Sequence, residues 1–305
     1  MGEVHQLLLE FGKEAALKAT GERAVVEAAV GYLAAEDAEI GFIYSGWAQA
    51  ALPHRRLADD AVWSIKTERL GLLVQPGLRM VPDGPEVPIG VPYGSRARLI
   101  LLYLQSEALR TGSRRIELGR SLRVWLGRLG IPIGGKSMRE VRDQAERISF
   151  CRLSFQVFQG SRTGLVNQLI LDEAMFDMDG RGEGGARFIE EAVLAESFYA
   201  QLKRHPVPVA EAAVRQLANN SLTLDVYCWL AYRLHVLHEP TPVSWRALHA
   251  QFGQGVGRLD NFRRYFRRIL ALALAVYPDA KVEDGEAGVT LHPSRPPISK
   301  PALTR

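Results

Sequence analysis

The stretch LDNFRRYFRRILALALAVY, residues 259–277, has the periodicity of a long amphipathic helix. At 100° per residue its apolar residues gather on one face: Phe262, Phe266, Ile269 and Ala273. Five arginines lie within residues 258–268, and Asp260 is the only acid among them. A solvated basic face is one explanation, but arginine also bonds guanine or phosphate with two hydrogen bonds, and Asn261 can pair with adenine. We therefore predict a helix whose arginine face enters the major groove of DNA.

The residues around this helix complete a small module. Two shorter helices are expected before it, over residues 223–237 and 244–253, and a hairpin is expected after it, over residues 280–294. Ser244 is the expected N-cap of the second helix, and Asp284-Gly285 begins the hairpin turn. Three helices followed by a hairpin are the order of a winged helix, a variant of the helix-turn-helix. We predict a second winged-helix module over residues 206–296.

Residues 93–178 repeat this order of elements. A first helix begins near the start of the segment, and Ser121 caps a second helix after a short strand. Apolar residues define one stripe of a third helix: Met138, Val141, Ala145 and Ile148. Two alternating runs, residues 151–158 and 165–176, then form a hairpin with Arg162 at its tip. We predict a first winged-helix module here, with no residue-level identity to the second.

At 305 residues the chain exceeds the usual size of a single core. The expected fold class is α+β, with tandem winged-helix modules that are mainly helical and carry small β-hairpin wings. We predict a helical N-terminal extension over residues 1–44 and a β-hairpin with the first winged-helix module over residues 45–178. A linker with a connecting helix follows over residues 179–205, then the second winged-helix module over residues 206–296 and a C-terminal tail over residues 297–305.

The charge of the chain is unevenly distributed. Residues 93–158 hold 13 Lys and Arg against 5 Asp and Glu, and residues 201–305 hold 14 against 8. The other two segments are acidic, with 8 basic against 13 acidic residues in 1–92 and 3 against 8 in 159–200. Two basic blocks separated by an acidic one indicate two surfaces for a polyanion.

Candidate DNA-binding residues follow from these two blocks. In the first module the third helix mixes basic residues with Glu140, Asp143 and Glu146, so ion pairs within the helix explain its charge as well as DNA contact does. The full set of candidates is Lys136, Arg139, Arg142, Arg147, Arg162, Arg258, Asn261, Arg263, Arg264, Arg267 and Arg268.

Other chemistry is poorly supported by the sequence. His235, His238 and His249 lack the thiol or carboxylate that would complete a zinc site, and Cys151 and Cys228 lie in apolar stretches as reduced core residues. The run DGRGEGG lacks the glutamate of a calcium loop and indicates a linker. No signal peptide, membrane span or phosphate-binding glycine loop is present. We expect a cytoplasmic protein that is not an enzyme and needs no metal or cofactor.

Several long blocks resemble the plasmid-encoded RepA replication protein family in the same order and spacing across residues 45–296. They are VPYGSRARLILLYLQSEALRTGSRRIELGRSLRVWLGRLGIPIGGK, MREVRDQAERI, FYAQLKRHPVPVAEAAVRQL, TLDVYCWLAYRL, SWRALHAQFG and NFRRYFRRILALALAVYPDAKVE. The resemblance implies a protein that binds repeated sites at a plasmid origin, helps to open the duplex and recruits the host replication initiator and helicase. It also places the family's DNA-contacting positions on Arg264, Arg267 and Arg268.

Alternatives remain at this point. A winged-helix transcriptional repressor, including an autorepressor, would share every feature except the origin as target. A recombinase or nicking enzyme would need a nucleophilic tyrosine with basic and histidine partners, and Tyr265 has no His-x-x-Arg element beside it. Residues 1–44 lie outside the resemblance and fit three roles: an oligomerisation arm that would make a homodimer, a partner site or a partly disordered segment.

Overall fold

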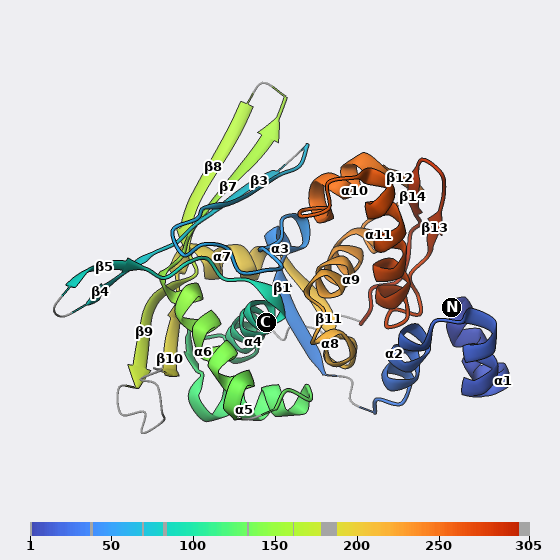
Figure 1. Ribbon diagram of the computed structural model, residues 1–305, viewed down its shortest axis with the longest axis horizontal. Helices are drawn as coiled ribbons and strands as arrows, with labels where there is room; N and C mark the ends of the chain where they lie inside the picture. Colours follow the sequence, from blue (N-terminus) through green and yellow to red (C-terminus); the bar gives the residue numbers. More distant parts are fainter. Residues whose placement is uncertain are drawn as a thin grey trace. The chain divides into compact units, whose positions relative to one another are not determined.

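The computed structural model describes residues 2–36, 39–68, 70–81, 84–132, 134–160, 162–177 and 188–298. The chain forms two compact units, which we call unit 1 (residues 1–49 and 207–305) and unit 2 (residues 50–206) (Figure 1). Both units combine helices with small antiparallel sheets. Within the described ranges, no helix has the length and apolar character needed to cross a membrane.

The N-terminal part of unit 1 contains α1 (Glu3–Thr20), α2 (Arg23–Leu33), β1 (Ile40–Tyr44) and α3 (Ser45–Gln49). The helix α1 bends at Gly12, whose φ of 79° is left-handed, and its buried His5 lies with Nε2 2.9 Å from the carbonyl oxygen of Ala275. The strand β1 pairs with β11 (Pro206–Ala210). Residues 2–36 and 39–44 belong to unit 1, and Val26 and Ile43 are buried in it.

The C-terminal part of unit 1 follows β11 with a set of helices and strands. They are α8 (Glu211–Leu217), α9 (Ser221–Leu234), β12 (Thr241–Ser244), α10 (Trp245–Phe252), α11 (Leu259–Leu274), β13 (Val282–Asp284) and β14 (Gly288–Leu291). The side chains of Asn220 and Ser244 cap α9 and α10 by accepting hydrogen bonds from backbone amides. The three strands form an antiparallel sheet in the order β12-β14-β13.

Unit 2 contains a comparable series of elements, interrupted by two strands of another sheet after its third helix. The elements of the series are α4 (Gly94–Thr111), β6 (Arg115–Glu117), α5 (Gly119–Arg128), α6 (Gly135–Phe150), β9 (Leu171–Asp177) and β10 (Phe188–Leu194), and α7 (Glu196–Arg204) follows them. The sheet order is β6-β10-β9, so the last strand lies between the other two, as β14 does in unit 1. The two units thus share one order in the small sheet, and their helices and strands follow one another in the same order except for two further strands between α6 and β9 in unit 2.

A second sheet in unit 2 contains the hairpin that the sequence predicted as the wing of the first module. Its strands are β2 (Trp63–Lys66), β3 (Leu70–Gln75), β7 (Arg152–Gln159) and β8 (Arg162–Leu169), in the order β2-β3-β7-β8. The sequence predicted a hairpin of residues 151–158 and 165–176, and β7 and β8 do form an antiparallel hairpin. The strand β7 also pairs with β3, where Leu153 and Phe155 are buried opposite Val74 and Leu72. The predicted second strand divides at Ile170 into β8 and β9, which belong to different sheets.

Two further elements of unit 2 differ from the sequence prediction. A separate hairpin of β4 (Leu78–Val81) and β5 (Gly84–Pro88) precedes α4. Of the predicted linker and connecting helix, residues 188–204 form β10 and α7, while residues 179–187 and the DGRGEGG run lie outside the described residues. The central strand of the small sheet therefore comes from a segment that the sequence indicated as a connection.

Candidate nucleic-acid interface

The helix α11 of unit 1 has one face in the core. Phe262 and Phe266 are fully buried, and Ile269 is nearly so. The Phe266 ring packs against Phe252 and Trp245 of α10, with ring centroids 5.6 and 6.1 Å apart. These aromatic contacts fix the rotation of α11 about its own axis, so its opposite face is held toward solvent.

The solvent face of α11 carries a continuous stripe of polar side chains. Asn261, Arg264, Tyr265 and Arg268 are all exposed and stand at helical spacing over two turns. Arg264 donates a hydrogen bond from Nη2 to Oδ1 of Asn261, 2.7 Å away. Sequence reasoning considered Tyr265 only as a nucleophile, yet its helical position places the ring, 45% exposed, in the middle of this stripe.

The other candidate arginines of α11 lie beside the stripe and have acidic neighbours. Arg263 is half-buried, 3.8 Å from Asp260. Arg267 donates from Nε to Oδ2 of Asp284 in β13, 2.7 Å away, and its guanidinium lies over the ring of Trp245. Arg258, at the N-cap position of α11, is exposed. Arg267 therefore has a partner within unit 1, and its side chain remains 42% exposed.

The hairpin of β13 and β14 is acidic at its turn. Glu283, Asp284 and Glu286 are exposed there, and Glu283 lies 3.1 Å from Nε2 of His292. Arg246 is exposed near the start of α10 and was missed by sequence reasoning, although its place just after a capping serine was a usable signal. The basic surface of this unit thus belongs to α10 and α11 and not to the hairpin.

On α6 of unit 2 the exposed candidates are Lys136 and Arg139, in the first turns of the helix. Arg142 is half-buried. The neighbouring helix α5 presents Arg120 and Arg123, which are exposed and which sequence reasoning did not select. The start of α6 is therefore the part of this helix that remains available to a ligand.

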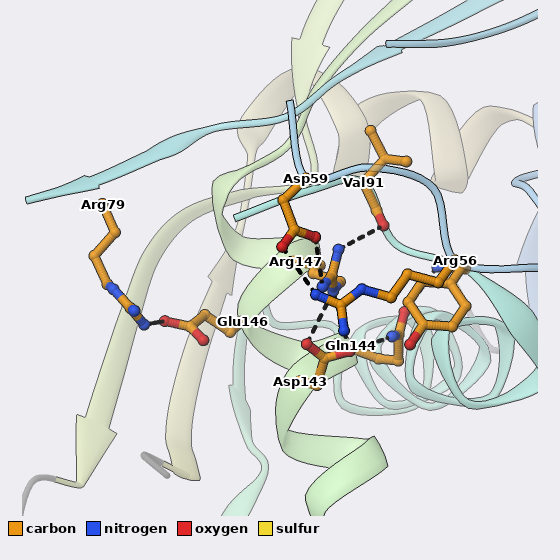
Figure 2. A network of polar contacts seen from close by, with 9 residues as sticks. Arg56, Asp59, Arg79, Val91, Asp143, Gln144, Glu146 and Arg147 are labelled. Atoms are coloured by element: carbon orange, nitrogen blue, oxygen red, sulfur yellow. Dashed lines mark hydrogen bonds and ion pairs between the residues drawn. The ribbon is translucent and has the colours of Figure 1, made fainter. Parts of the chain in front are cut away.

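The prediction that Arg147 contacts DNA is wrong. Its side chain is 3% exposed, and the guanidinium lies 3.0 Å from Oδ1 of both Asp59 and Asp143 (Figure 2). Its Nη1 also donates to the carbonyl oxygen of Val91. Burial alone would raise the pKa of Asp59, but hydrogen bonds from Arg56 and Arg147 lower it below the usual value. Arg147 thus holds the segments before α4 onto α6.

Arg162 lies where the sequence placed it, at the tip of the β7–β8 hairpin, opposite Gln159. It is exposed at the start of β8, in the four-stranded sheet, and the small sheet of unit 2 is formed by β6, β9 and β10 instead. The hairpin of β9 and β10 carries acids, with Glu191 paired to Arg115 and Glu173 exposed. Arg162 is therefore not at the tip of the hairpin that corresponds to β13 and β14.

The histidines and cysteines have structural surroundings. The ring nitrogens of His235 and His249 lie 2.7 and 2.6 Å from the carbonyl oxygens of Ala231 and Val256. Burial raises the pKa of the Cys151 thiol to about 12, which keeps it protonated. In the part of the chain that the structure describes, no group of three or more His, Cys, Asp or Glu side chains is placed to hold a metal ion.

Comparison with known proteins gives one family and one fold. A family model described as plasmid-encoded RepA protein matches residues 91–247, just over half of the chain. The crystal structure of domains 2 and 3 of RctB has a TM-score of 0.53 and 13% identity, covering 84% of this chain and 99% of that one, which shows a shared fold. A second structure of the same RctB domains has a TM-score of 0.45 and 11% identity, covering 79% of this chain and 92% of the other. Curated protein sequences give no significant match.

Proposed function

The chain belongs to the family of plasmid-encoded RepA proteins, which are replication initiators, and we propose that it binds repeated sites in the duplex DNA of a plasmid origin. The observation that carries this proposal is the polar stripe of α11, formed by Asn261, Arg264, Tyr265 and Arg268. A stripe with a buried aromatic back and an arginine front is suited to hydrogen-bond base edges in a major groove.

We further propose that each unit contains a winged-helix module. In unit 1 a helix is followed by a strand, two helices and two strands, and unit 2 has the same order with β7 and β8 inserted before the last two strands. In both units the last of these strands lies in the centre of the small sheet. This order of helices followed by a terminal hairpin supports the assignment, with α11 and α6 as the recognition helices. The hairpins β13–β14 and β9–β10 are then the two wings.

The two modules offer different surfaces to DNA. In unit 1, α11 presents arginines along two turns, whereas in unit 2 only the first turns of α6 present Lys136 and Arg139. A chain with two unlike reading helices has no internal two-fold axis, so the expected target is an asymmetric site that repeats head to tail. By family membership, the same chain would recruit the host replication initiator and helicase to these repeats.

Footprinting and affinity measurements on duplexes from the region around its gene test this function. Arg264→Ala with Arg268→Ala should lower the affinity for the protected site by about a hundredfold, because each bidentate base contact contributes roughly 1–3 kcal/mol. The matched control is Lys18→Ala with Arg23→Ala, which removes two exposed positive charges from α1 and α2 of the same unit. An unchanged affinity with a normal circular dichroism spectrum would show that α11 does not read DNA.

A further inference from the structure

Trp245, at the start of α10, is attached to the turn between β13 and β14. Its backbone amide donates to the carbonyl oxygen of Ala287, 3.0 Å away, and its indole Nε1 donates to that of Gly285, 3.1 Å away. The side chain is 1% exposed and its ring packs edge-on against Phe266 of α11. One tryptophan thus contacts α11 and the wing turn while it begins α10.

Arg267 adds a second connection between α11 and the wing. The guanidinium carbon lies 5.0 Å from the centroid of the Trp245 ring, and Nε donates to Asp284 Oδ2 at 2.7 Å. A planar guanidinium can stack on an aromatic face while its edge bonds a carboxylate, which an ammonium group cannot reproduce. We call Trp245, Arg267 and Asp284 the clasp.

The wing turn of unit 1 is acidic, which gives the clasp a role near DNA. The turn after β13 exposes Asp284 and Glu286, and carboxylates near a DNA backbone are repelled by its phosphates. Such a wing cannot be held in place by DNA, so its position beside α11 has to be fixed by the protein. The clasp provides this restraint in the absence of any ligand.

We propose that Arg267 is a positioning residue that fixes the wing of unit 1 beside α11 and thereby sets how α11 enters the groove, and that it does not bind DNA itself. This proposal rests on the proposed DNA-binding function. A wing fixed in one place restricts α11 to one orientation in the groove, because binding residues need neighbours that hold them in the productive geometry. Loss of the clasp would let the acidic turn move toward the phosphates.

The direction in which one substitution changes the affinity for DNA distinguishes this proposal from a simple effect of charge. Asp284→Asn removes a negative charge near the DNA, so charge alone predicts tighter binding. The clasp predicts instead that Asp284→Asn weakens binding to the cognate duplex by roughly fivefold, the value of a well-formed exposed ion pair, while binding to a scrambled duplex does not weaken. Glu286→Gln is the matched control, because it removes the same charge from the same turn without touching the clasp.

A double-mutant cycle tests whether Arg267 acts through Asp284. Arg267→Gln with Asp284→Asn should bind the cognate duplex no more weakly than Arg267→Gln alone, because both substitutions break one contact. Equal tightening by Asp284→Asn and Glu286→Gln, or additive losses in the double variant, would overturn the proposal and make Arg267 a direct DNA contact.

Hydrogen exchange in the free protein tests the clasp without DNA. Asp284→Asn should speed exchange of the Trp245 and Gly285 amides, which bond across the wing turn, by roughly threefold to fivefold. Glu286→Gln should leave both amides unchanged. Unchanged exchange in Asp284→Asn would refute the clasp even if DNA binding is confirmed, whereas faster exchange in a protein that binds no duplex would refute only the proposed function.

Discussion

Arg147 lies on α6 and Arg268 on α11, and their neighbours decide what each can do. Arg147 is enclosed by Asp59 and Asp143, so its charge is neutralised inside unit 2. Arg268 stands on the solvent face of α11. Helical periodicity places both residues off the apolar stripe, but it carries no information on Asp59, which comes from a segment far away in the sequence. Burial of a charged side chain depends on such distant partners.

Gly90 tests the structural role assigned to Arg147. Its φ is 82°, and a Cβ atom built on it would lie 2.0 Å from Arg147 Nη1. We expect Gly90→Ala to lower the free energy of unfolding by about 2–3 kcal/mol, because it adds backbone strain and displaces a buried ion pair. Urea unfolding followed by circular dichroism gives this quantity.

The control for Gly90 is Gly112, which ends α4 in the same unit with a φ of 68° and where an added Cβ would have no atom within 4 Å. Gly112→Ala should cost only the left-handed strain of about 1 kcal/mol. Equal losses in the two variants would mean that the contact between Gly90 and Arg147 contributes nothing.

At the scale of elements, helices were easier to predict than strand partners. The residues of α11 were identifiable because their buried and exposed faces alternate with the helical period over 16 residues. The hairpin of β7 and β8 was predicted, but the sheet that it joins was not, because the buried faces of β3 and β7 determine that pairing. The partners of a strand are set by burial elsewhere in the chain, which local alternation does not reveal.

Reassignment of the wing changes which basic residues of unit 2 should matter for binding. Lys136→Ala with Arg139→Ala should reduce the slope of log K against log salt by roughly 1.8, since each phosphate contact contributes about 0.9. Arg162→Ala, which removes an exposed charge from β8 in the other sheet, should leave the slope unchanged. Fluorescence titrations of a labelled cognate duplex at several salt concentrations measure both. A larger effect of Arg162→Ala would restore the β7–β8 hairpin as a DNA-contacting element.

At the scale of the whole molecule, the two units share an order of elements and differ in charge. The repeat of helix, strand, helix, helix and two strands, which β7 and β8 interrupt in unit 2, was partly visible in the sequence because α6 and α11 each have a clear apolar stripe. The exposed residues of the two helices differ, because α11 exposes arginines over two turns, whereas Arg147 of α6 is buried in an ion pair with Asp59. A two-fold dimeric repressor would select inverted half-sites, whereas one chain with two unlike modules would select an asymmetric site.

Selection of binding sites from random duplex DNA tests the central claim most directly. If the chain is an initiator that reads DNA with two unlike modules, the selected site should be asymmetric and span roughly 20 bp, two adjacent turns of the major groove. Arg264→Ala should relax one half of that site and Arg139→Ala the other, and copies of the site should occur as direct repeats near the gene. Recovery of an inverted repeat, or of a site that neither substitution alters, would contradict the account.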